Sequence, residues 1–241
     1  MRRLWWSLRK RMLRLDRRPR QVERLGARWR LDPTDWLEAR LLIGQPFEAE
    51  QQARFAQRLA ARRPSRLYDI GANFGLYAVT SALASPDLQV EAFEPVGRTR
   101  EKLTLNVALN GLEDRVRVHG LALSDGPGRA DIAIDPRSSG LSTLSASADE
   151  AARRDFLQTE TVLTEALDAL FAPEGETVAL KVDVEGHEPQ ALAGAARLLA
   201  RNDGLAMVET RSRNAAEVRA AFEAAGWRET GRITEEVFFE K

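Results

Sequence analysis

The sequence predicts an α/β fold, in which a doubly wound, seven-stranded and mostly parallel sheet follows a helical N-terminal extension. Three observations predict it. Short apolar runs alternate with helix-like stretches from residue 66 onward, a pattern typical of parallel sheets covered by helices. A glycine-rich turn at residues 71–75 follows the first of these runs. The chain of 241 residues, 44% hydrophobic and 30% charged, is long enough for one such domain with an appendage.

The extension is expected to span residues 1–64, and the sheet-bearing domain residues 65–241. Within the extension, a turn at residues 32–35 leads into a helix at 36–41. A second helix is predicted from about residue 48 to residue 62, where a proline soon follows and stops it.

The first 30 residues are strongly basic, with eleven Arg and one Lys against Asp16 and Glu23, a net charge of +10. Because the whole chain is neutral, residues 31–241 carry a net charge of −10. Apolar residues recur at helical spacing along residues 4–15, so an amphipathic helix is predicted there.

Three interpretations of this basic arm remain open. It packs its apolar stripe on the body, it lies on an anionic membrane surface with Trp5 and Trp6 among the headgroups, or it contacts a nucleic acid or a protein partner. The acidic remainder of the chain argues against nucleic acid. Neither a signal-peptide core nor a bilayer-spanning run is evident, so we expect a cytoplasmic protein that can lie peripherally on the membrane through residues 1–30.

The body of the chain contains seven predicted strands, at residues 67–70, 89–94, 115–119, 177–184, 204–209, 227–233 and 236–240. Predicted helices lie between them, at residues 76–84, 98–110, 189–201 and 215–225. The last two strands have so short a connection that they must form an antiparallel hairpin, since a parallel crossover needs a dozen residues or more. We therefore expect six parallel strands and a seventh that is antiparallel.

Residues 125–160 break this rhythm. Residues 131–134 could form an extra strand, and residues 138–143 are loop-like. An insertion at this place could cover the mouth of a binding site.

The first turn of the sheet carries an acid, Asp69, two residues before its first glycine, Gly71, and a second glycine at Gly75. Ligands of open parallel sheets bind beyond the carboxyl ends of the strands, so this turn is expected to line the site. Its spacing differs from the G-x-G-x-x-G pattern of dinucleotide-binding folds. The carboxylate of Asp69 would repel a pyrophosphate and attract a cation.

A second acid, Glu94, ends the next predicted strand. A carboxylate at this place can accept hydrogen bonds from both hydroxyls of a ribose. Acids at two strand ends suit S-adenosyl-L-methionine, which has a ribose, a sulfonium and an ammonium group but no phosphate. An NAD-dependent oxidoreductase with an unusual turn is the alternative that this argument leaves open.

Five motifs of the chain resemble the FkbM family of methyltransferases. They lie at residues 69–75 (DIGANFG), 93–95 (FEP), 106–111 (NVALNG), 122–125 (ALSD) and 181–188 (KVDVEGHE), the last being the most distinctive. The resemblance implies a class I, Rossmann-like S-adenosylmethionine-binding domain that transfers a methyl group to oxygen, often to a hydroxyl of a sugar or of a polyketide-type natural product. By their places in these motifs, the residues implied to bind the cofactor are Asp69, Gly71, Asn73, Gly75, Glu94 and, near the adenine, Asp125.

The segment at residues 181–188 concentrates ionisable groups at the end of the fourth predicted sheet strand. Gly186 permits a sharp turn there, so Asp183, Glu185 and His187 are expected at the rim where the methyl group emerges. A hydroxyl nucleophile gains from a general base. We expect His187 or Asp183 in that role, and Glu185 in positioning the substrate.

No metal site is assigned from the sequence. The chain has no cysteine and two histidines, which argues against thiolate and multi-histidine sites. Asp183 and Glu209 end two predicted strands and could share a divalent cation, but two carboxylates do not define a site. The acceptor is expected to be a small molecule or a saccharide. An RNA methyltransferase that grips phosphates with its basic arm, and a non-catalytic cofactor-binding protein, remain alternatives.

Overall fold

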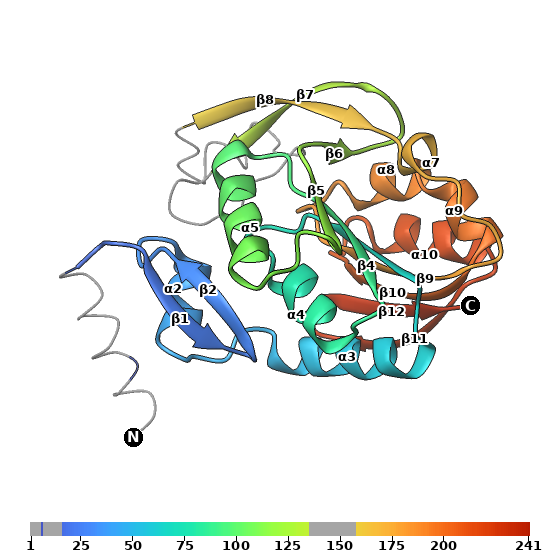
Figure 1. Cartoon of the computed structure of the whole chain (residues 1–241). Helices are drawn as coiled ribbons and strands as arrows, with labels where there is room; N and C mark the ends of the chain where they lie inside the picture. Colours follow the sequence, from blue (N-terminus) through green and yellow to red (C-terminus); the bar gives the residue numbers. More distant parts are fainter. Residues whose placement is uncertain (1–5, 7–15, 135–157) are drawn as a thin grey trace.

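The computed structural model describes Trp6, residues 16–134 and residues 158–241 (Figure 1). Apart from Trp6, the predicted amphipathic helix of the basic arm lies outside the described residues, as does the predicted loop at 138–143. Trp6 is partly buried and packs against the main hydrophobic core. Within the described ranges, every helix is too short or too polar to cross a lipid bilayer.

A seven-stranded sheet forms the centre of the molecule, in the order β11-β12-β10-β9-β3-β4-β5 (Figure 1). Its strands are β3 (Arg66–Ile70), β4 (Gln89–Phe93), β5 (Val116–His119), β9 (Thr177–Val182), β10 (Asp203–Glu209), β11 (Arg228–Ile233) and β12 (Glu236–Glu240). In this sheet β12 runs antiparallel to both of its neighbours, and the other pairs are parallel. The predicted seven-stranded, mostly parallel sheet is thereby confirmed. The order reverses between β3 and β9, where ligands bind in such sheets.

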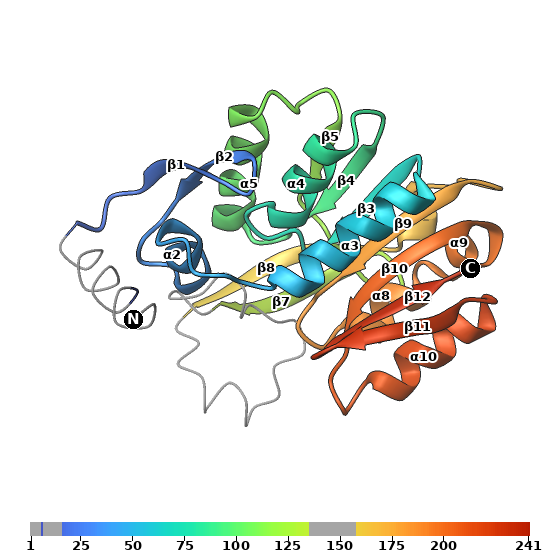
Figure 2. The same cartoon turned by 90° about the horizontal axis from the view of Figure 1, so that it is seen from below.

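Helices cover both faces of this sheet. The helices α3 (Ala49–Arg62), α4 (Leu76–Ala84) and α5 (Gly97–Leu109) share one core cluster on one face. The opposite face packs against α8 (Glu188–Ala193), α9 (Ala196–Arg201) and α10 (Ala215–Ala224). Seen from below, α3 runs along the sheet, and α2 lies near its beginning (Figure 2).

The helix predicted over residues 189–201 is broken into α8 and α9. The break lies at Gly194, where an added Cβ would stand 1.9 Å from the carbonyl oxygen of Ser124. This close approach of two backbones requires glycine, and it is a long-range contact that helical periodicity cannot reveal.

The N-terminal extension is not helical throughout, and the sequence prediction is wrong over residues 20–31. There β1 (Arg20–Arg24) and β2 (Ala27–Leu31) form an antiparallel hairpin. Every second residue of β2 is buried, as in a strand with one face on the core. Leu25 and Gly26 form the turn with φ values of 53° and 73°, the positive φ that two-residue hairpin turns prefer. This alternation of buried and exposed positions was not recognised in the sequence, because the segment is rich in arginine.

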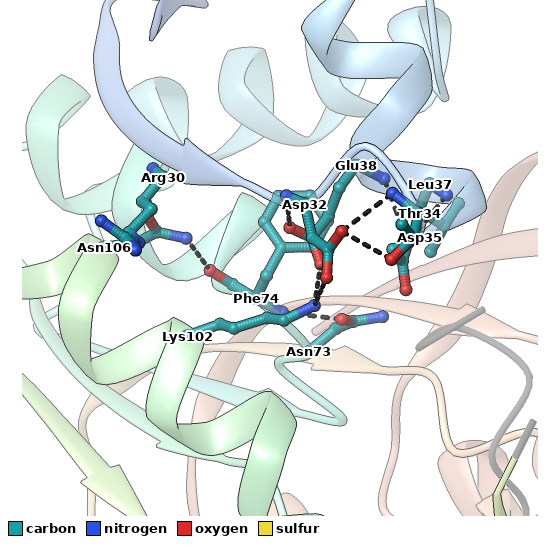
Figure 3. A network of polar contacts seen from close by, with 10 residues as sticks. All are labelled: Arg30, Asp32, Thr34, Asp35, Leu37, Glu38, Asn73, Phe74, Lys102 and Asn106. Atoms are coloured by element: carbon teal, nitrogen blue, oxygen red, sulfur yellow. Dashed lines mark hydrogen bonds and ion pairs between the residues drawn. The ribbon is translucent and has the colours of Figure 1, made fainter. Parts of the chain in front are cut away.

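A buried polar network ties the extension to the domain (Figure 3). Asp35 caps α2 (Trp36–Leu42) by accepting from its first backbone N–H groups. Glu38 has no exposed surface, and its carboxylate accepts from Nζ of Lys102 over 2.5 Å and from the backbone N–H of Asp32 over 2.6 Å. Lys102 belongs to α5, so extension and domain are held together. The division of the chain at residues 64 and 65 stays a prediction.

The insertion after β5 forms a second, three-stranded sheet of β6 (Ala122–Leu123), β8 (Gln158–Glu165) and β7 (Gly128–Ile134), which the short α7 (Leu167–Leu170) follows. The extra strand expected near residues 131–134 is therefore present. Its apolar side packs on Val96, the residue that precedes α5, and Oε1 of Glu160 accepts from the backbone N–H of Gly97 over 3.0 Å. The insertion thus lies over the carboxyl end of β4.

Candidate functional site

A cavity of about 770 Å³ opens at the carboxyl ends of the central strands. The sequence-predicted site residues that line it are Gly71, Asn73, Glu94, Asp183 and Glu185. Those that do not line it are Asp69, Gly75, Asp125 and His187. The insertion adds Ile132 to the wall and the extension adds Trp36, so both appendages help to enclose the site.

The glycine turn brings the ends of β3, β4 and β9 together. Gly71 has a φ of 81°, and an added Cβ would lie 1.9 Å from the carbonyl oxygen of Asp183. The backbone N–H groups of Gly71 and Ala72 both donate to the carbonyl oxygen of Phe93. Only glycine allows this approach and this φ, so the turn is fixed by contacts on both sides. Gly75 begins α4 and packs against Leu103 of α5 instead of lining the cavity.

Glu94 presents a buried carboxylate to the cavity, 7% exposed. Its Oε2 accepts from the backbone N–H of Asn73 over 3.0 Å, and its Oε1 from that of Val96 over 2.9 Å. Burial raises the pKa of Glu94 to about 7, although both hydrogen bonds oppose this rise. Each carboxylate oxygen has a second lone pair, so Glu94 can still accept from a ligand.

Asp69 lies behind the turn and not in the cavity wall, contrary to the expectation that it faces the ligand. It is 1% exposed, and within the described chain neither carboxylate oxygen has a hydrogen-bond partner. Along β3 the side chains alternate, and Asp69 is in register with Lys181 on β9. Burial raises the pKa of Asp69 to about 6, and the Lys181 cation acts against this rise.

Asp183 stands at the end of β9 next to a buried cation. Nζ of Lys181 donates to its Oδ2 over 2.7 Å. Burial acts to raise the pKa of Asp183, but the charge and hydrogen bond of Lys181 outweigh it, and the pKa is held below its ordinary value. Asp183 is therefore an ionised acceptor in the cavity wall at neutral pH.

Glu185 and Glu209 bring two more carboxylates to Asp183, and one oxygen of each of the three lies within 4.8 Å of the others. Arg211 donates to Glu185 and lies 3.6 Å from Glu209. Burial and the charge of Asp183 raise the pKa of Glu209 to about 9, so this carboxyl holds a proton at neutral pH. The three oxygens could hold a divalent cation, or they can bind polar groups of a substrate.

His187 and Asp125 both contact Ser124, outside this cavity. Nε2 of His187 lies 3.0 Å from Oγ of Ser124, which also donates to Oδ1 of Asp125. Burial lowers the pKa of His187. The turn through Glu185 and Gly186, with φ values of 55° and 106°, directs the chain away from the cavity before His187. Of the two candidate bases, the structure thus brings only Asp183 to the cavity.

Several cavity residues were not predicted from the sequence, among them Glu48, Tyr77, Arg211 and Glu235. Glu48 precedes α3 at a φ of 46°, and its Oε2 accepts from the hydroxyl of Tyr77 over 2.8 Å. Tyr77 could have been predicted from the sequence, because it lies just after the glycine turn. Glu48 could not, since its approach depends on how the extension packs on the domain.

A family model described as the methyltransferase FkbM domain matches residues 69–229 of the chain. The match covers more than half of the chain and includes the glycine turn, Glu94 and the segment at 181–188. The chain belongs to the FkbM methyltransferase family. Membership in this methyltransferase family implies S-adenosylmethionine as the cofactor, and the oxidoreductase alternative is set aside.

Other similarities are distant. The methyltransferase is 33% identical over 90 residues to AmbE, the AMB antimetabolite synthetase of Pseudomonas aeruginosa, a match to 37% of this chain and 4% of AmbE. It therefore spans a small fraction of that relative's length. An O-methyltransferase family protein from Burkholderia thailandensis aligns with 80% of this chain and 55% of its own, at 10% identity and a TM-score of 0.47. Precorrin-6y C5,15-methyltransferase from Geobacter metallireducens aligns with 80% and 89%, at 12% identity and a TM-score of 0.46.

The residues of this FkbM methyltransferase fit the cofactor that its family implies. Asp69 lies behind the turn, outside the cavity wall, so it would contribute to binding a cationic cofactor only through its buried charge. Glu94 keeps acceptor capacity for ribose hydroxyls. Gly71 and Asn73 line the cavity and would contact the bound cofactor. When bound, S-adenosylmethionine supplies an activated methyl group.

Proposed function

We propose that this FkbM methyltransferase transfers the methyl group of S-adenosylmethionine to a hydroxyl oxygen of an uncharged polar acceptor, such as a saccharide or a small natural product. One observation carries the proposal. The ionised carboxylate of Asp183, held by Lys181 over 2.7 Å, stands in the wall of the cavity that also contains Glu94 and the glycine turn.

The residues at this wall can bind and deprotonate a hydroxyl group. Asp183 accepts a hydrogen bond from the acceptor hydroxyl, and it takes up the proton as the new carbon–oxygen bond forms. Lys181 fixes the direction of the carboxylate. Glu209, whose pKa is raised by burial and by the charge of Asp183, can share its proton with Asp183 and so help to hold that carboxylate in place. Most of the rate gain comes from holding the two reactants in one geometry.

The charge of the cavity favours a neutral acceptor over a phosphate-rich one. Six acidic residues line it, against the basic residues Lys181 and Arg211, and the wall keeps a net negative charge even with Glu209 protonated. Phosphates would be repelled from this wall, which supports a saccharide or similar molecule over RNA as acceptor.

The experiment is methyl transfer from labelled S-adenosylmethionine to a panel of hydroxylated acceptors, with the products tested for methyl ethers. Asp183→Asn should lower kcat about 100-fold or more and leave the Kd for S-adenosylmethionine within about twofold. Asp203→Asn, an exposed acid at the opposite end of β10, is the matched control and should retain full activity. Equal rates for the two variants, or methylation of nitrogen alone, would contradict the proposal.

A further inference from the structure

A second cavity of about 590 Å³ lies beside the first, between α2, α3 and α4. Five residues line both cavities, and they come from α2, the loop before α3, the glycine turn and the start of α4: Leu37, Phe47, Phe74, Leu76 and Tyr77. The two cavities therefore meet at a common apolar wall. Pockets for drug-sized ligands measure roughly 300–1,000 Å³, so each volume alone is of ligand size.

The second cavity is mainly apolar. Three of its polar side chains bond to the backbone, whereas within the described chain Nε of Arg24 and Oε1 of Gln45 are buried without a hydrogen-bond partner. Nε2 of Gln52 donates to the carbonyl oxygen of Phe47 over 2.7 Å, and Oγ1 of Thr80 donates to that of Leu76 over 2.6 Å. Arg24 directs Nη1 to the carbonyl oxygen of Glu23. Most of the remaining wall is aliphatic or aromatic, from residues such as Leu41 and Leu59.

Tyr77 marks the boundary between polar and apolar surroundings. Its hydroxyl donates to Glu48, which lines the first cavity and not the second. Nζ of Lys181 lies 5.2 Å from the centroid of its ring, also on the side of the first cavity. A ligand that crosses this boundary would have a polar part near Lys181 and an apolar part beyond Tyr77.

Large apolar side chains are exposed at both cavities. Leu25, in the wall of the second, is 55% exposed, and Trp36, in the wall of the first, is 52% exposed. Leu25 occupies a hairpin turn at a φ of 53°, a position where a small polar residue is usual. Exposed apolar side chains beside an apolar cavity fit an occupant that is itself apolar.

We propose that the second cavity binds the hydrocarbon chain of the methyl acceptor, whose hydroxyl-bearing end lies in the first cavity. The acceptor is thus an amphiphile, with a polyhydroxylated head and an alkyl tail. This inference rests on the proposed function, because it names the acceptor of that reaction. The first cavity takes the cofactor and the polar head, and the tail passes the shared wall at Phe47 and Tyr77.

Calorimetric titration of the full chain with hexyl, octyl and decyl glucosides, below their micelle concentrations, tests the proposal. The affinity should rise about fourfold per buried methylene group. Ala56→Phe places a ring in the second cavity from the exposed face of α3, and it should remove the dependence on chain length. Ala61→Phe is the matched control, since Ala61 is exposed on the same helix and lines neither cavity.

S-adenosylmethionine is titrated into the same three proteins, so that the two proposals fail separately. If the unaltered protein does not bind S-adenosylmethionine, the proposed function is wrong. If all three proteins bind it and affinity for the glucosides is independent of chain length, the second cavity holds no acceptor chain. The same conclusion follows if Ala56→Phe and Ala61→Phe give equal affinities, or if a segment of the protein itself covers the cavity and no glucoside binds.

Discussion

The side-chain amide of Asn106 donates a hydrogen bond to the carbonyl oxygen of Phe74 over 2.9 Å, in the middle of the glycine turn (Figure 3). Its Oδ1 accepts from the backbone N–H of Arg30 over 2.8 Å. One fully buried residue of α5 therefore joins the N-terminal hairpin to the turn that would hold the cofactor. The extension is part of the architecture of the site.

Asn106→Ala should weaken both folding and cofactor binding. It leaves the carbonyl of Phe74 and the N–H of Arg30 without partners, which costs about 2–4 kcal/mol of unfolding free energy. Asn110 bonds to the backbone of Arg28 on the same hairpin and does not touch the turn, so Asn110→Ala is the control. Urea unfolding and calorimetry should show lower stability for both variants, and a weaker Kd for S-adenosylmethionine in Asn106→Ala alone. Equal Kd values would show that the turn does not depend on Asn106.

Gly71→Ala should disrupt the turn itself. Its Cβ would lie 1.9 Å from the carbonyl oxygen of Asp183, so β3 and β9 would have to separate. Gly111 has a similar φ of 65°, but nothing lies within 4 Å of its added Cβ. Gly111→Ala should therefore cost only about 1–2 kcal/mol for the left-handed conformation. Thermal unfolding of the two variants separates the cost of the close contact with Asp183 from the cost of the left-handed conformation. A similar loss in both would mean that the contact with Asp183 is unimportant.

The strands of the sheet were predictable because each one is marked by a local pattern in the sequence. Apolar runs, the glycine turn and the short link before β12 are each contained in a few neighbouring residues. The hairpin of β1 and β2 was also local, since every second residue of β2 is buried, but residues 1–64 were interpreted as a helical extension. Gly194 could not be recognised as a helix break, because its constraint comes from Ser124, far away in the sequence.

The site residues that directly follow strands were predictable from the sequence. Glu94 and Asp183 follow strands directly, and both line the cavity. Beyond a tight turn the direction of a side chain depends on backbone angles, so His187 was expected in the cavity and lies beside Ser124 instead. Asp69 was placed on the correct strand, but its side chain is buried behind the turn instead of lining the cavity, which the sequence does not reveal.

Glu38 should make folding stability dependent on pH. Burial, and next the charge of Asp35, raise its pKa to about 7 from 4.5 in spite of the Lys102 cation. The folded state therefore binds a proton more tightly than the unfolded state does. The contribution of this group is complete below about pH 4.5 and is lost as the pH rises through 7, in total about 3 kcal/mol.

Glu38→Gln cannot ionise, so its unfolding free energy should fall less than that of the unaltered protein between pH 5 and pH 8, a window set by the same pKa shift. Urea unfolding at both ends of this window measures the difference. Glu101→Gln, an exposed position on α5, serves as control. If both variants follow the pH dependence of the unaltered protein, Glu38 does not titrate in this window.

Calorimetric titration of S-adenosylmethionine into the purified full chain, and into Glu94→Gln and Glu91→Gln, tests the central claim most directly. Glu94 follows β4 and lines the cavity, whereas Glu91 lies within β4 and pairs with His119 and Arg66. Saturable binding to the unaltered protein is expected, with affinity about 10- to 100-fold weaker in Glu94→Gln and nearly unchanged in Glu91→Gln. An absence of binding to the unaltered protein, or equal affinity in Glu94→Gln, would contradict the assignment of this cavity to the cofactor.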